Sequence, residues 1–560
     1  MLHDDGLVSG LSTGAGSANV TGVKPDGFHG VFRDDDCARA VYAEGAGIAR
    51  TIPAAVAVPA DAGDVCALVR WAAETRTPLI ARGSGSGMAG GAVGAGVIVD
   101  LSRLDSIGPV DVERRRVTVG PGALRGAVNE RARRHKLRFP VDPSSGAFCT
   151  IGGMAATNAA GAHTLRYGAM RAWVTALDCV FDDGSRALVQ RGATPPEVPA
   201  IERFLAGAHA AILASPGRVR AHPGVRKDSS GYALADYARS GELLELLVGS
   251  EGTLAMFVGV ELSLASLPGA TSSLVAEFPS LEQAVDGAAR ARTGGASACE
   301  LLDRTFVEVA RGGAAPVAID EDSEAVLLVE IEAGDAGAAT AMAHVMEQGL
   351  TACGATRVTV ALSTEDEATL WTLRHAASPI LNRLSPSLKS MQFIEDAAVP
   401  PEKLPQYVRG VREVLARHGV RGVIFGHAGD SHIHVNPLVD IRLANWRQSV
   451  QEILDEVTSL AAQLGGTIAG EHGDGRLRTP LLDRVWDPRS TALFAEVKRA
   501  FDPLNILNPG VKVPVGAAPL GDIKYDPALP PLPAEARAAL DAVERERGWS
   551  NFRLSMIGGG

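Results

Sequence analysis

The sequence predicts an α+β chain built from two unlike parts. Between about residues 49 and 265, short strands are separated by glycine clusters. From 266 to 500 these clusters disappear, and strands alternate with helices as in a sheet with helices laid over it. At 560 residues the chain is too long for one hydrophobic core. We therefore divide it into an N-terminal arm (1–48), the glycine-rich part (49–265), the layered part (266–500), a return segment (501–515) and a C-terminal tail (516–560).

The composition excludes several classes of protein. Apolar residues make up 46% of the chain and charged residues 21%, which is ordinary globular usage. A net charge of −11 with no opposing basic stripe argues against a nucleic-acid partner. The acidic N-terminus lacks the apolar core of a secretory signal, and no run approaches the ~18 apolar residues of a membrane span. Six scattered cysteines without a C-x-x-C pair indicate a reduced, cytoplasmic protein without a cysteine-rich iron–sulfur motif.

The first glycine cluster lies between two predicted strands. A strand at 55–58, a helix at 62–73 and a strand at 78–81 precede it, and a strand at 97–101 follows it. Gly85 to Gly90 matches G-x-G-x-x-G, but that dinucleotide motif must open a helix, and here a strand follows. We interpret the segment as a nest of backbone amides for an anion such as a pyrophosphate, with a purely structural loop as the alternative. Seven glycines in the fourteen residues 83–96 remove side-chain cover, which favours close approach of a ligand.

A second glycine-rich region follows a predicted strand at 117–119 and a helix at 124–134. It comprises the segments 140–145, 149–154, 158–161 and 167–168. Two such regions in one part indicate a long ligand that is held along its length. A strand at 173–181 with a hairpin turn at 182–184, and the segments 227–232 and 247–254, complete this part.

The second part is predicted to be layered. Its predicted strands are 274–278, 326–331, 356–361 and 391–394, and its helices are 281–292, 338–348, 365–384 and 401–418. Helices at about 446–464 and 491–500 flank a turn at 470–475. Prolines between 527 and 533, followed by a charged helix at 534–547, predict a surface tail.

Histidines concentrate on a predicted strand–turn–strand segment, residues 423–436. An apolar run opens it, and Gly426 and Gly429 permit the reversal. The period of two then places three polar side chains on one face: His432, His434 and Asn436.

These histidines are candidates for a metal site. His427 before the turn can meet His434 after it, and two neutral imidazoles with Glu471 would suit zinc or another borderline divalent metal with one position open. His472 would remain free as a proton acceptor. The alternative is a set of hydrogen-bonded histidines in a polar turn; the whole cluster, flanked by glycines, favours an active site.

In this order, the motifs resemble the flavin-dependent oxidoreductases of the vanillyl-alcohol oxidase/p-cresol methylhydroxylase (PCMH) class, in the branch of D-lactate, glycolate and D-2-hydroxyglutarate dehydrogenases. The resemblance covers roughly residues 50 to 515. It implies a two-part α/β FAD-binding domain of the PCMH type and an α+β cap domain with an antiparallel sheet covered by helices. The common family loop reads G-G-G-T, whereas this chain has Gly83-Ser84-Gly85-Ser86, which keeps the last hydroxyl. The residues that it implies for FAD are Arg82, Gly83, Ser84, Gly85, Ser86, Gly87, Gly90, Pro143, Ser144, Thr150, Gly152, Gly153, Asn158, Gly161, Glu251, Gly252 and Asn508.

The resemblance also implies roles in the cap. Arg374 matches the family arginine that binds the substrate carboxylate, a use suited to its bidentate fork. Ser378 and Lys389 fall where the branch places further substrate-contacting groups. The remaining matches are metal ligands at His427, His434 and Glu471 for zinc or manganese, a polar contact at Asn436 and the general base at His472.

The implied activity is FAD-dependent oxidation of a D-2-hydroxy acid, with hydride transfer to the flavin. The electron acceptor is expected to be a quinone, a cytochrome or an electron-transfer flavoprotein rather than NAD. A homodimer is compatible with the sequence, and the acceptor could hold the protein at the membrane surface. Two alternatives remain open: a transferase of the alkyl-dihydroxyacetone-phosphate synthase type, and a non-catalytic flavoprotein subunit. The sequence leaves the particular acid undefined.

Overall fold

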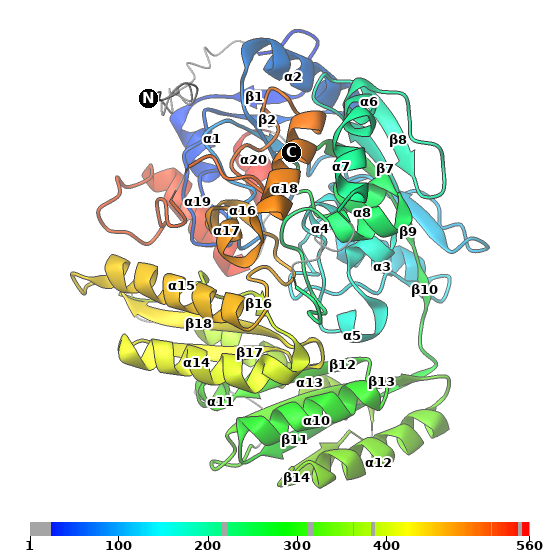
Figure 1. Cartoon of the computed structure of the whole chain (residues 1–560), viewed down its shortest axis with the longest axis vertical. Helices are drawn as coiled ribbons and strands as arrows, with labels where there is room; N and C mark the ends of the chain where they lie inside the picture. Colours follow the sequence, from blue (N-terminus) through cyan, green and yellow to red (C-terminus); the bar gives the residue numbers. More distant parts are fainter. Residues whose placement is uncertain are drawn as a thin grey trace, which may run out of the picture.

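The structure, a computed structural model, describes residues 24–215, 222–311, 319–361, 363–381, 387–516, 518–546 and 551–558. Figure 1 shows the two predicted parts stacked one above the other, with the glycine-rich part and helices α19 and α20 above and the layered part below. The α+β class that the sequence predicts is confirmed, since both parts consist of sheets and helices, with a mixed sheet and an antiparallel sheet in the upper part and an antiparallel sheet in the lower part.

The first sheet has the strand order β1-β2-β4-β3. Its strands are β1 (Val31–Arg33), β2 (Ala55–Val58), β3 (Leu79–Arg82) and β4 (Val97–Asp100), with β2 and β3 parallel to β4. Helix α2 (Ala62–Thr75) begins where Asp61 accepts from the Asp64 amide, and it covers one face. The other face packs against α1 (Asp36–Val41) and the C-terminal tail. The described part of the predicted arm, residues 24 to 48, therefore contributes a strand to the first sheet, because β1 pairs with β2.

The second sheet is antiparallel, in the order β5-β9-β7-β8. Its strands are β5 (Arg116–Val119), β9 (Met256–Ser263), β7 (Val174–Val180) and β8 (Arg186–Gln190). The short strands β6 (Leu137–Arg138) and β10 (Ala265–Ser266) pair separately. The helices and 3-10 turn of this part are α3 (Arg125–Arg133), α4 (Ile151–Thr157), α5 (Thr164–Tyr167), η1 (Met170–Ala172), α6 (Pro199–Ala206), α7 (Ala208–Leu213), α8 (Leu234–Ser240) and α9 (Leu243–Leu247).

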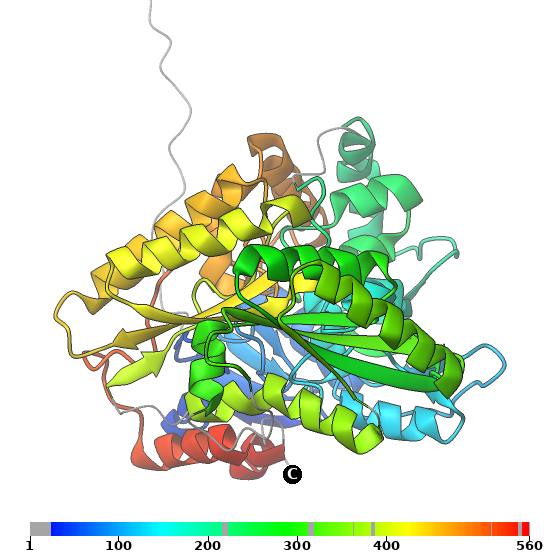
Figure 2. The ribbon, with the colours of Figure 1, turned by 90° about the horizontal axis from the view of Figure 1, so that it is seen from below.

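The layered part is built on an antiparallel sheet, here called the histidine sheet, in the order β14-β11-β13-β12-β17-β18-β15, with β16 beside β18. Its strands are β11 (Ala270–Phe278), β12 (Ala298–Asp303), β13 (Ala325–Ala333), β14 (Arg357–Val360), β15 (Leu388–Ser390), β16 (Ala397–Ala398), β17 (Arg421–His427) and β18 (His432–Asp440). Helices α10 (Leu281–Thr293), α12 (Ala336–Ala352), α14 (Leu404–Arg417) and α15 (Trp446–Gln463) cover one face, as Figure 2 shows. The opposite face meets α11 (Arg304–Arg311) and α13 (Thr364–Leu381).

Two details of this sheet differ from the sequence prediction. The predicted strand at 391–394 is wrong: β15 ends at Ser390, opposite Leu438, because the next partner, Pro437, has no N–H to continue the ladder. Its carbonyl still accepts from the Met391 amide at 2.9 Å. The central strand β12 was not predicted, because it is buried along its whole length and shows no alternation.

The chain returns to the first part after residue 475. After α16 (Gly475–Arg478), η4 (Thr479–Leu481), α17 (Leu482–Val485) and α18 (Pro488–Phe501), the return segment places the Leu79 amide 2.7 Å from the carbonyl of Ile506. Helices α19 (Ala534–Glu546) and α20 (Asn551–Met556) then lie beside α1. The prediction of a surface tail is wrong, since Leu540, Leu554 and Ile557 are buried against the first sheet. The proline-rich composition conceals the apolar spacing of this segment. The remaining 3-10 turns are η2 (Pro401–Lys403) and η3 (Ala428–Asp430).

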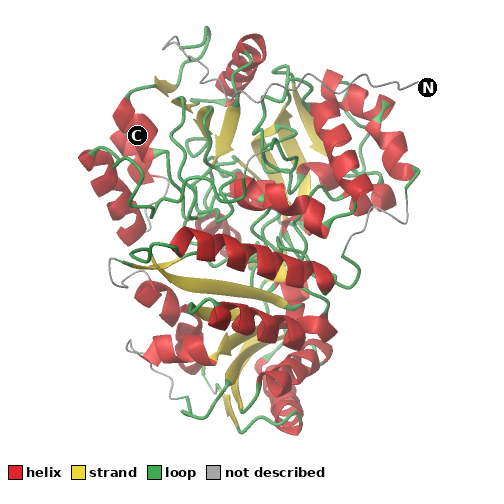
Figure 3. Ribbon diagram, turned by 60° about the vertical axis from the view of Figure 1, so that its left-hand side comes forward, coloured by secondary structure: helices red, strands yellow, loops and turns green. Residues whose placement is uncertain are grey.

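Within the described ranges no helix is long and apolar enough to cross a membrane. Many loops of the upper part gather above the histidine sheet (Figure 3).

Candidate active site

Three histidines lie on one face of the β17–β18 hairpin, and the predicted strand–turn–strand is confirmed. Its register places His427 opposite His432 and Phe425 opposite His434, so these side chains point to the same side of the sheet. The ring centroids of the three imidazoles are 4.6 to 5.4 Å apart, and all three residues are buried.

Glu471 reaches the histidines from the turn after α15. Its Oε1 lies 3.2 Å from His427 Nε2 and 3.4 Å from His434 Nε2, so the structure brings together all three predicted metal ligands. Its Oε2 accepts from the buried ammonium of Lys227 at 3.0 Å. Burial raises the pKa of the Glu471 carboxyl, but Lys227 and His427 outweigh it and hold that pKa well below its usual range. Glu471 is therefore a buried carboxylate.

Hydrogen bonds behind the rings fix which nitrogen of each imidazole faces Glu471. The Nδ1–H of His434 donates to the carbonyl of Glu395 at 2.7 Å, because a carbonyl can only accept. The Nδ1 of His427 lies 2.5 Å from Glu300 Oε1 and donates to it. In the neutral rings, both Nε2 lone pairs then face the Glu471 carboxylate, which is unfavourable unless a proton or a cation lies between them.

His432 adds a fourth donor that the sequence placed on this face but did not include among the ligands. Its Nε2 lies 2.9 Å from Asp396 Oδ1, and its Nδ1 is buried without a hydrogen-bond partner, 4.0 Å from Glu471 Oε2. Burial lowers the pKa of His432 to about 3, so the ring is neutral. A metal ion between the unpaired Nδ1 of His432 and the Glu471 carboxylate would bind both groups. The four groups present donor atoms within 4.8 Å of one another, a nitrogen-rich set that suits zinc or a similar divalent ion.

His472 lies beside this set and is its most accessible histidine. Its ring stacks on that of His434 with centroids 5.4 Å apart, and its side chain is 27% exposed. The Nδ1 lies 2.7 Å from Glu395 Oε2, and the Nε2 lies 3.7 Å from Glu471 Oε1. Burial lowers the pKa of His472, but the carboxylates of Glu395 and Asp396 outweigh burial and raise it to about 10. Without an added cation the ring therefore carries a proton at neutral pH.

Arg374 is joined to the histidines through Glu300. Its Nε donates to Glu300 Oε2 at 2.6 Å, while the other oxygen of that carboxylate holds His427. The guanidinium lies 4.8 Å from the centroid of the Phe425 ring. Burial raises the pKa of Glu300, but His427 and Arg374 outweigh it and lower that pKa far below its usual range. Sequence reasoning missed Glu300 because its strand, β12, was not predicted.

The other predicted cap residues are placed less directly. Asn436 is half-buried on β18, two residues after His434 and therefore on the same face. Lys389 lies on the edge strand β15, with its ammonium 5.4 Å from the ring of Tyr525 in the tail. The structure thus reports a tail contact for Lys389 rather than a histidine contact. Ser378 falls on α13, and its side chain lies outside the described residues.

The first glycine loop connects β3 directly to β4, so the predicted strand–loop–strand is confirmed. Ser84 Oγ and Ser86 Oγ lie 3.1 Å apart, and Gly85 has a φ of 76°. No atom lies within 4 Å of the position a Cβ would take at the exposed Gly87. The protein itself therefore does not require glycine there, whereas a ligand against the loop would. Arg82 lies beneath the loop, fully buried, and donates to backbone carbonyls.

The second glycine region adjoins the first. A Cβ at Gly83 would collide with the side chain of Thr150, which caps α4 by accepting from the Gly153 amide at 3.3 Å. Asn158 ends α4 in the left-handed conformation, with a φ of 52°. Gly152 packs against Pro121, the Gly161 carbonyl accepts from Lys227, and Pro143 and Ser144 lie in the preceding loop.

Glu251 and Asn508 connect the glycine loop, the turn after Glu471 and the return segment by hydrogen bonds. Glu251, at a φ of 55°, accepts from the amides of Asp474 at 2.7 Å and Gly475 at 3.0 Å. The Asn508 amide donates to the carbonyls of Gly91 at 3.0 Å and of Glu251 at 2.7 Å. Gly252 follows Glu251 in sequence and has a φ of 73°. The glycine loop, the turn carrying Glu471 and the return segment therefore meet at one place, although they are far apart in sequence.

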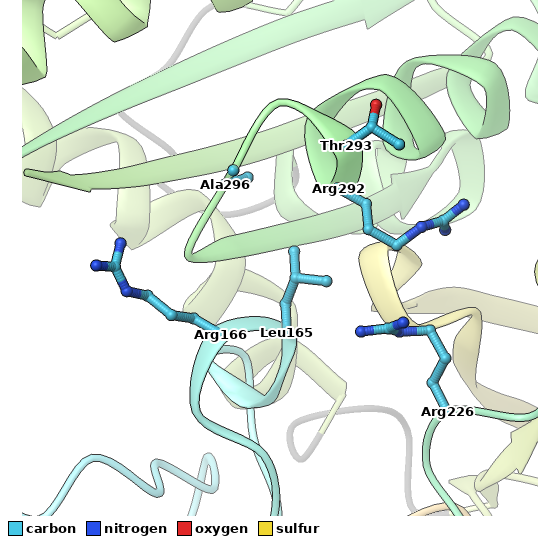
Figure 4. A pocket seen from close by; sticks show the side chains of 7 residues that line it. Leu165, Arg166, Arg226, Arg292, Thr293 and Ala296 are labelled. Carbon is cyan, nitrogen blue, oxygen red and sulfur yellow. The ribbon is translucent and has the colours of Figure 1, made fainter.

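A separate cavity of about 560 Å³ opens at the seam between α5 and α10 (Figure 4). Arg226 and Arg166 on its wall are already close to carboxylates, at 3.2 Å from Asp430 and 3.7 Å from Glu332. The histidine cluster does not line this cavity.

Family models match most of the chain. Residues 53–188 match an FAD-binding domain, and residues 267–511 match the C-terminal domain of FAD-linked oxidases. A D-lactate dehydrogenase of Archaeoglobus fulgidus is 31% identical over 81% of this chain and 90% of its own length. The glycolate oxidase subunit GlcD of Bacillus subtilis is 28% identical over 86% and 93%. A D-2-hydroxyglutarate dehydrogenase of Pseudomonas putida is 28% identical over 98% of this chain and 56% of its own length.

Solved structures share the fold at low sequence identity. p-Cresol methylhydroxylase with substrate bound aligns with a TM-score of 0.65 and 12% identity, over 87% of this chain and 95% of the other. An alkyldihydroxyacetonephosphate synthase aligns with a TM-score of 0.58 and 14% identity, over 85% and 82%. At these identities the likeness concerns the fold alone, and the PCMH-type fold that the sequence predicts is confirmed.

Proposed function

We propose that this chain oxidises a D-2-hydroxy acid to the 2-oxo acid. The premise is that the chain belongs to the FAD-linked oxidoreductase family of D-lactate dehydrogenase, glycolate oxidase subunit GlcD and D-2-hydroxyglutarate dehydrogenase. One observation carries the proposal. The buried donor set His427, His432, His434 and Glu471 is joined through Glu300 to Arg374, and the more accessible His472 lies beside it.

Each group has a chemical task in this proposal. Arg374, held by Glu300 through Nε, would bind the substrate carboxylate, which selects acids over simple alcohols. His427, His432, His434 and Glu471 would hold a divalent metal, zinc or manganese, which supplies Lewis-acid polarisation of the hydroxyl oxygen. Bound FAD, along the two glycine regions, supplies the hydride acceptor.

His472 would accept the hydroxyl proton at Nε2. Glu395 holds its Nδ1 at 2.7 Å, so the opposite nitrogen, Nε2, faces the donor set and lies 3.7 Å from Glu471 Oε1. A proton acceptor must be neutral, yet Glu395 and Asp396 raise the pKa of His472 to about 10 against the opposing effect of burial. Positive charge on the neighbouring donor set opposes the charge on His472, so metal binding is expected to lower this pKa toward neutrality. In this arrangement the base becomes competent only when the metal site is filled.

The test is anaerobic mixing of the FAD-loaded protein with D-lactate, glycolate and D-2-hydroxyglutarate, and with the L-enantiomers of the chiral acids, while the flavin absorbance is followed. The proposal expects bleaching by at least one D-acid, and reoxidation by a quinone, a cytochrome or an electron-transfer flavoprotein rather than by NAD. Flavin that no 2-hydroxy acid bleaches would favour a non-catalytic flavoprotein or a transferase of the alkyl-dihydroxyacetone-phosphate synthase type.

A further inference from the structure

The tail of the chain contributes a buried layer beside the glycine loop. Leu540 on α19 and Leu554 on α20 pack against Val56, Ile80 and Ile98 on the face of the first sheet opposite α2. Residues 531–558 lie beyond both ranges that match the family models, which end at 188 and 511. This layer of the first part is therefore built by sequence that the two domain models do not include.

One charged side chain extends from this layer to the loop itself. Arg553, 1% exposed, donates from Nη1 to the carbonyl of Ser84 at 3.0 Å and from Nη2 to the carbonyl of Glu44 at 3.1 Å. Arg82 donates to the same Glu44 carbonyl at 2.9 Å. A Cβ at Gly85 would approach Arg553 Nη1 to 2.8 Å, so the loop rests directly on this guanidinium.

The two guanidinium groups place positive charge behind the loop. Burial, together with the neighbouring charge of Arg82, lowers the pKa of Arg553 to about 9, which still leaves it protonated at neutral pH. Both groups donate to backbone carbonyls, which turns these carbonyls toward the interior. Nearby counter-charges are Asp100, bonded to the Tyr42 hydroxyl at 2.7 Å, and Glu44, paired with Arg537 at 2.8 Å.

We infer that helices α19 and α20 are part of the cofactor-binding structure, with Arg553 as a positioning residue that holds Ser84 and Gly85 ready for the diphosphate of FAD. Arg553 binds the loop from the protein interior, whereas Gly87 of the same loop is exposed, and the charge of Arg553 favours an anion on the exposed side. FAD binding therefore depends on the end of the chain as well as on the glycine loop.

The test compares FAD binding by apoprotein of the wild type and of Arg553→Met, Arg553→Lys and Arg545→Ala. Flavin fluorescence quenching gives the Kd, and thermal unfolding of each apoprotein gives its Tm. Two charge-assisted hydrogen bonds are lost in Arg553→Met, so its Kd should rise about 10- to 100-fold. Arg553→Lys keeps the charge but not the fork and should lie between the two. Arg545→Ala, which removes an exposed guanidinium of the same tail, should keep the wild-type Kd.

A Kd for Arg553→Met within twofold of the wild type would overturn the inference, even if its Tm fell, because the role would then be structural only. Equal rises in Kd for Arg545→Ala and Arg553→Met would also overturn it. If Arg553→Met does not fold, Arg553→Lys decides: a wild-type Kd refutes the bidentate contact, and a raised Kd at unchanged apoprotein Tm supports it. Since binding is measured without substrate, these outcomes are independent of the proposed oxidation.

Discussion

Replacement of Glu300 by glutamine tests the link between the acid-binding arginine and the metal-binding histidines. The carboxylate accepts from Arg374 Nε at 2.6 Å and from His427 Nδ1 at 2.5 Å, and it is fully buried. The glutamine amide keeps the shape of the side chain and one acceptor oxygen, but its NH₂ group would face a donor, either Arg374 Nε or His427 Nδ1. One charge-assisted hydrogen bond is therefore lost, at a cost of about 2 kcal/mol, which corresponds to a roughly 30-fold loss of kcat/KM. Metal affinity should fall about 10- to 100-fold, because the amide cannot orient His427 as the carboxylate does.

The assay is steady-state oxidation of the best D-2-hydroxy acid with a dye acceptor, combined with metal analysis after dialysis at matched free zinc. Glu277→Gln is the matched control, because Glu277 is a buried carboxylate of the same sheet that pairs with Arg357 and accepts from Ser323. The control should lose stability but keep its metal and its kcat/KM. If Glu300→Gln keeps kcat/KM within threefold and the full metal content, the reasoning about this bridge is refuted.

Three further predictions concern single histidines. His472→Ala should lower kcat by ~100-fold or more with an unchanged FAD spectrum, and near-normal turnover would remove His472 from the mechanism. His432→Ala should weaken metal binding about tenfold or more, because the buried Nδ1 of His432, which has no hydrogen-bond partner, is proposed to be a metal ligand. Unchanged metal affinity in a competitive chelator titration would show that only His427, His434 and Glu471 are ligands. His163 bridges Asp142 and Glu330, whose charges outweigh burial and raise its pKa from 6.5 to about 11. The protonated His163 therefore stabilises the fold fully below about pH 6.5, and this contribution declines as pH rises toward 11. The difference in unfolding free energy between the wild type and His163→Gln should shrink between pH 6 and 10. A difference that stays constant with pH in urea titrations would contradict this prediction.

The hairpin could be predicted from sequence because its signals are local. Glycines on both sides of a turn and a period of two place His427 opposite His432 and bring His434 onto the same face without knowledge of any other segment. The glycine loop was predictable for the same reason, since the strand after it excludes a helix-opening motif.

What could not be predicted depends on contacts between distant segments. Glu300 and Lys227 lie 127 residues from His427 and 244 residues from Glu471, and neither carries a local motif. The tail was misread because its prolines indicate a loop, whereas the pairing of Arg553 with Ser84, 469 residues away, is visible only in the folded chain. Arg82 was predicted to bind the cofactor, but the structure uses its side chain to hold backbone carbonyls beneath the loop.

The most direct measurement is stopped-flow reduction of bound FAD by a D-2-hydroxy acid, in zinc- or manganese-loaded protein and in protein stripped of metal with its FAD retained. With His472 made competent by charge on the neighbouring donor set, the loaded protein should reduce its flavin at least ~100-fold faster, and metal should restore the rate. Equal rates in the two samples, with metal content verified, would contradict the claim that the histidine sheet and the glycine loops form one metal-dependent active site.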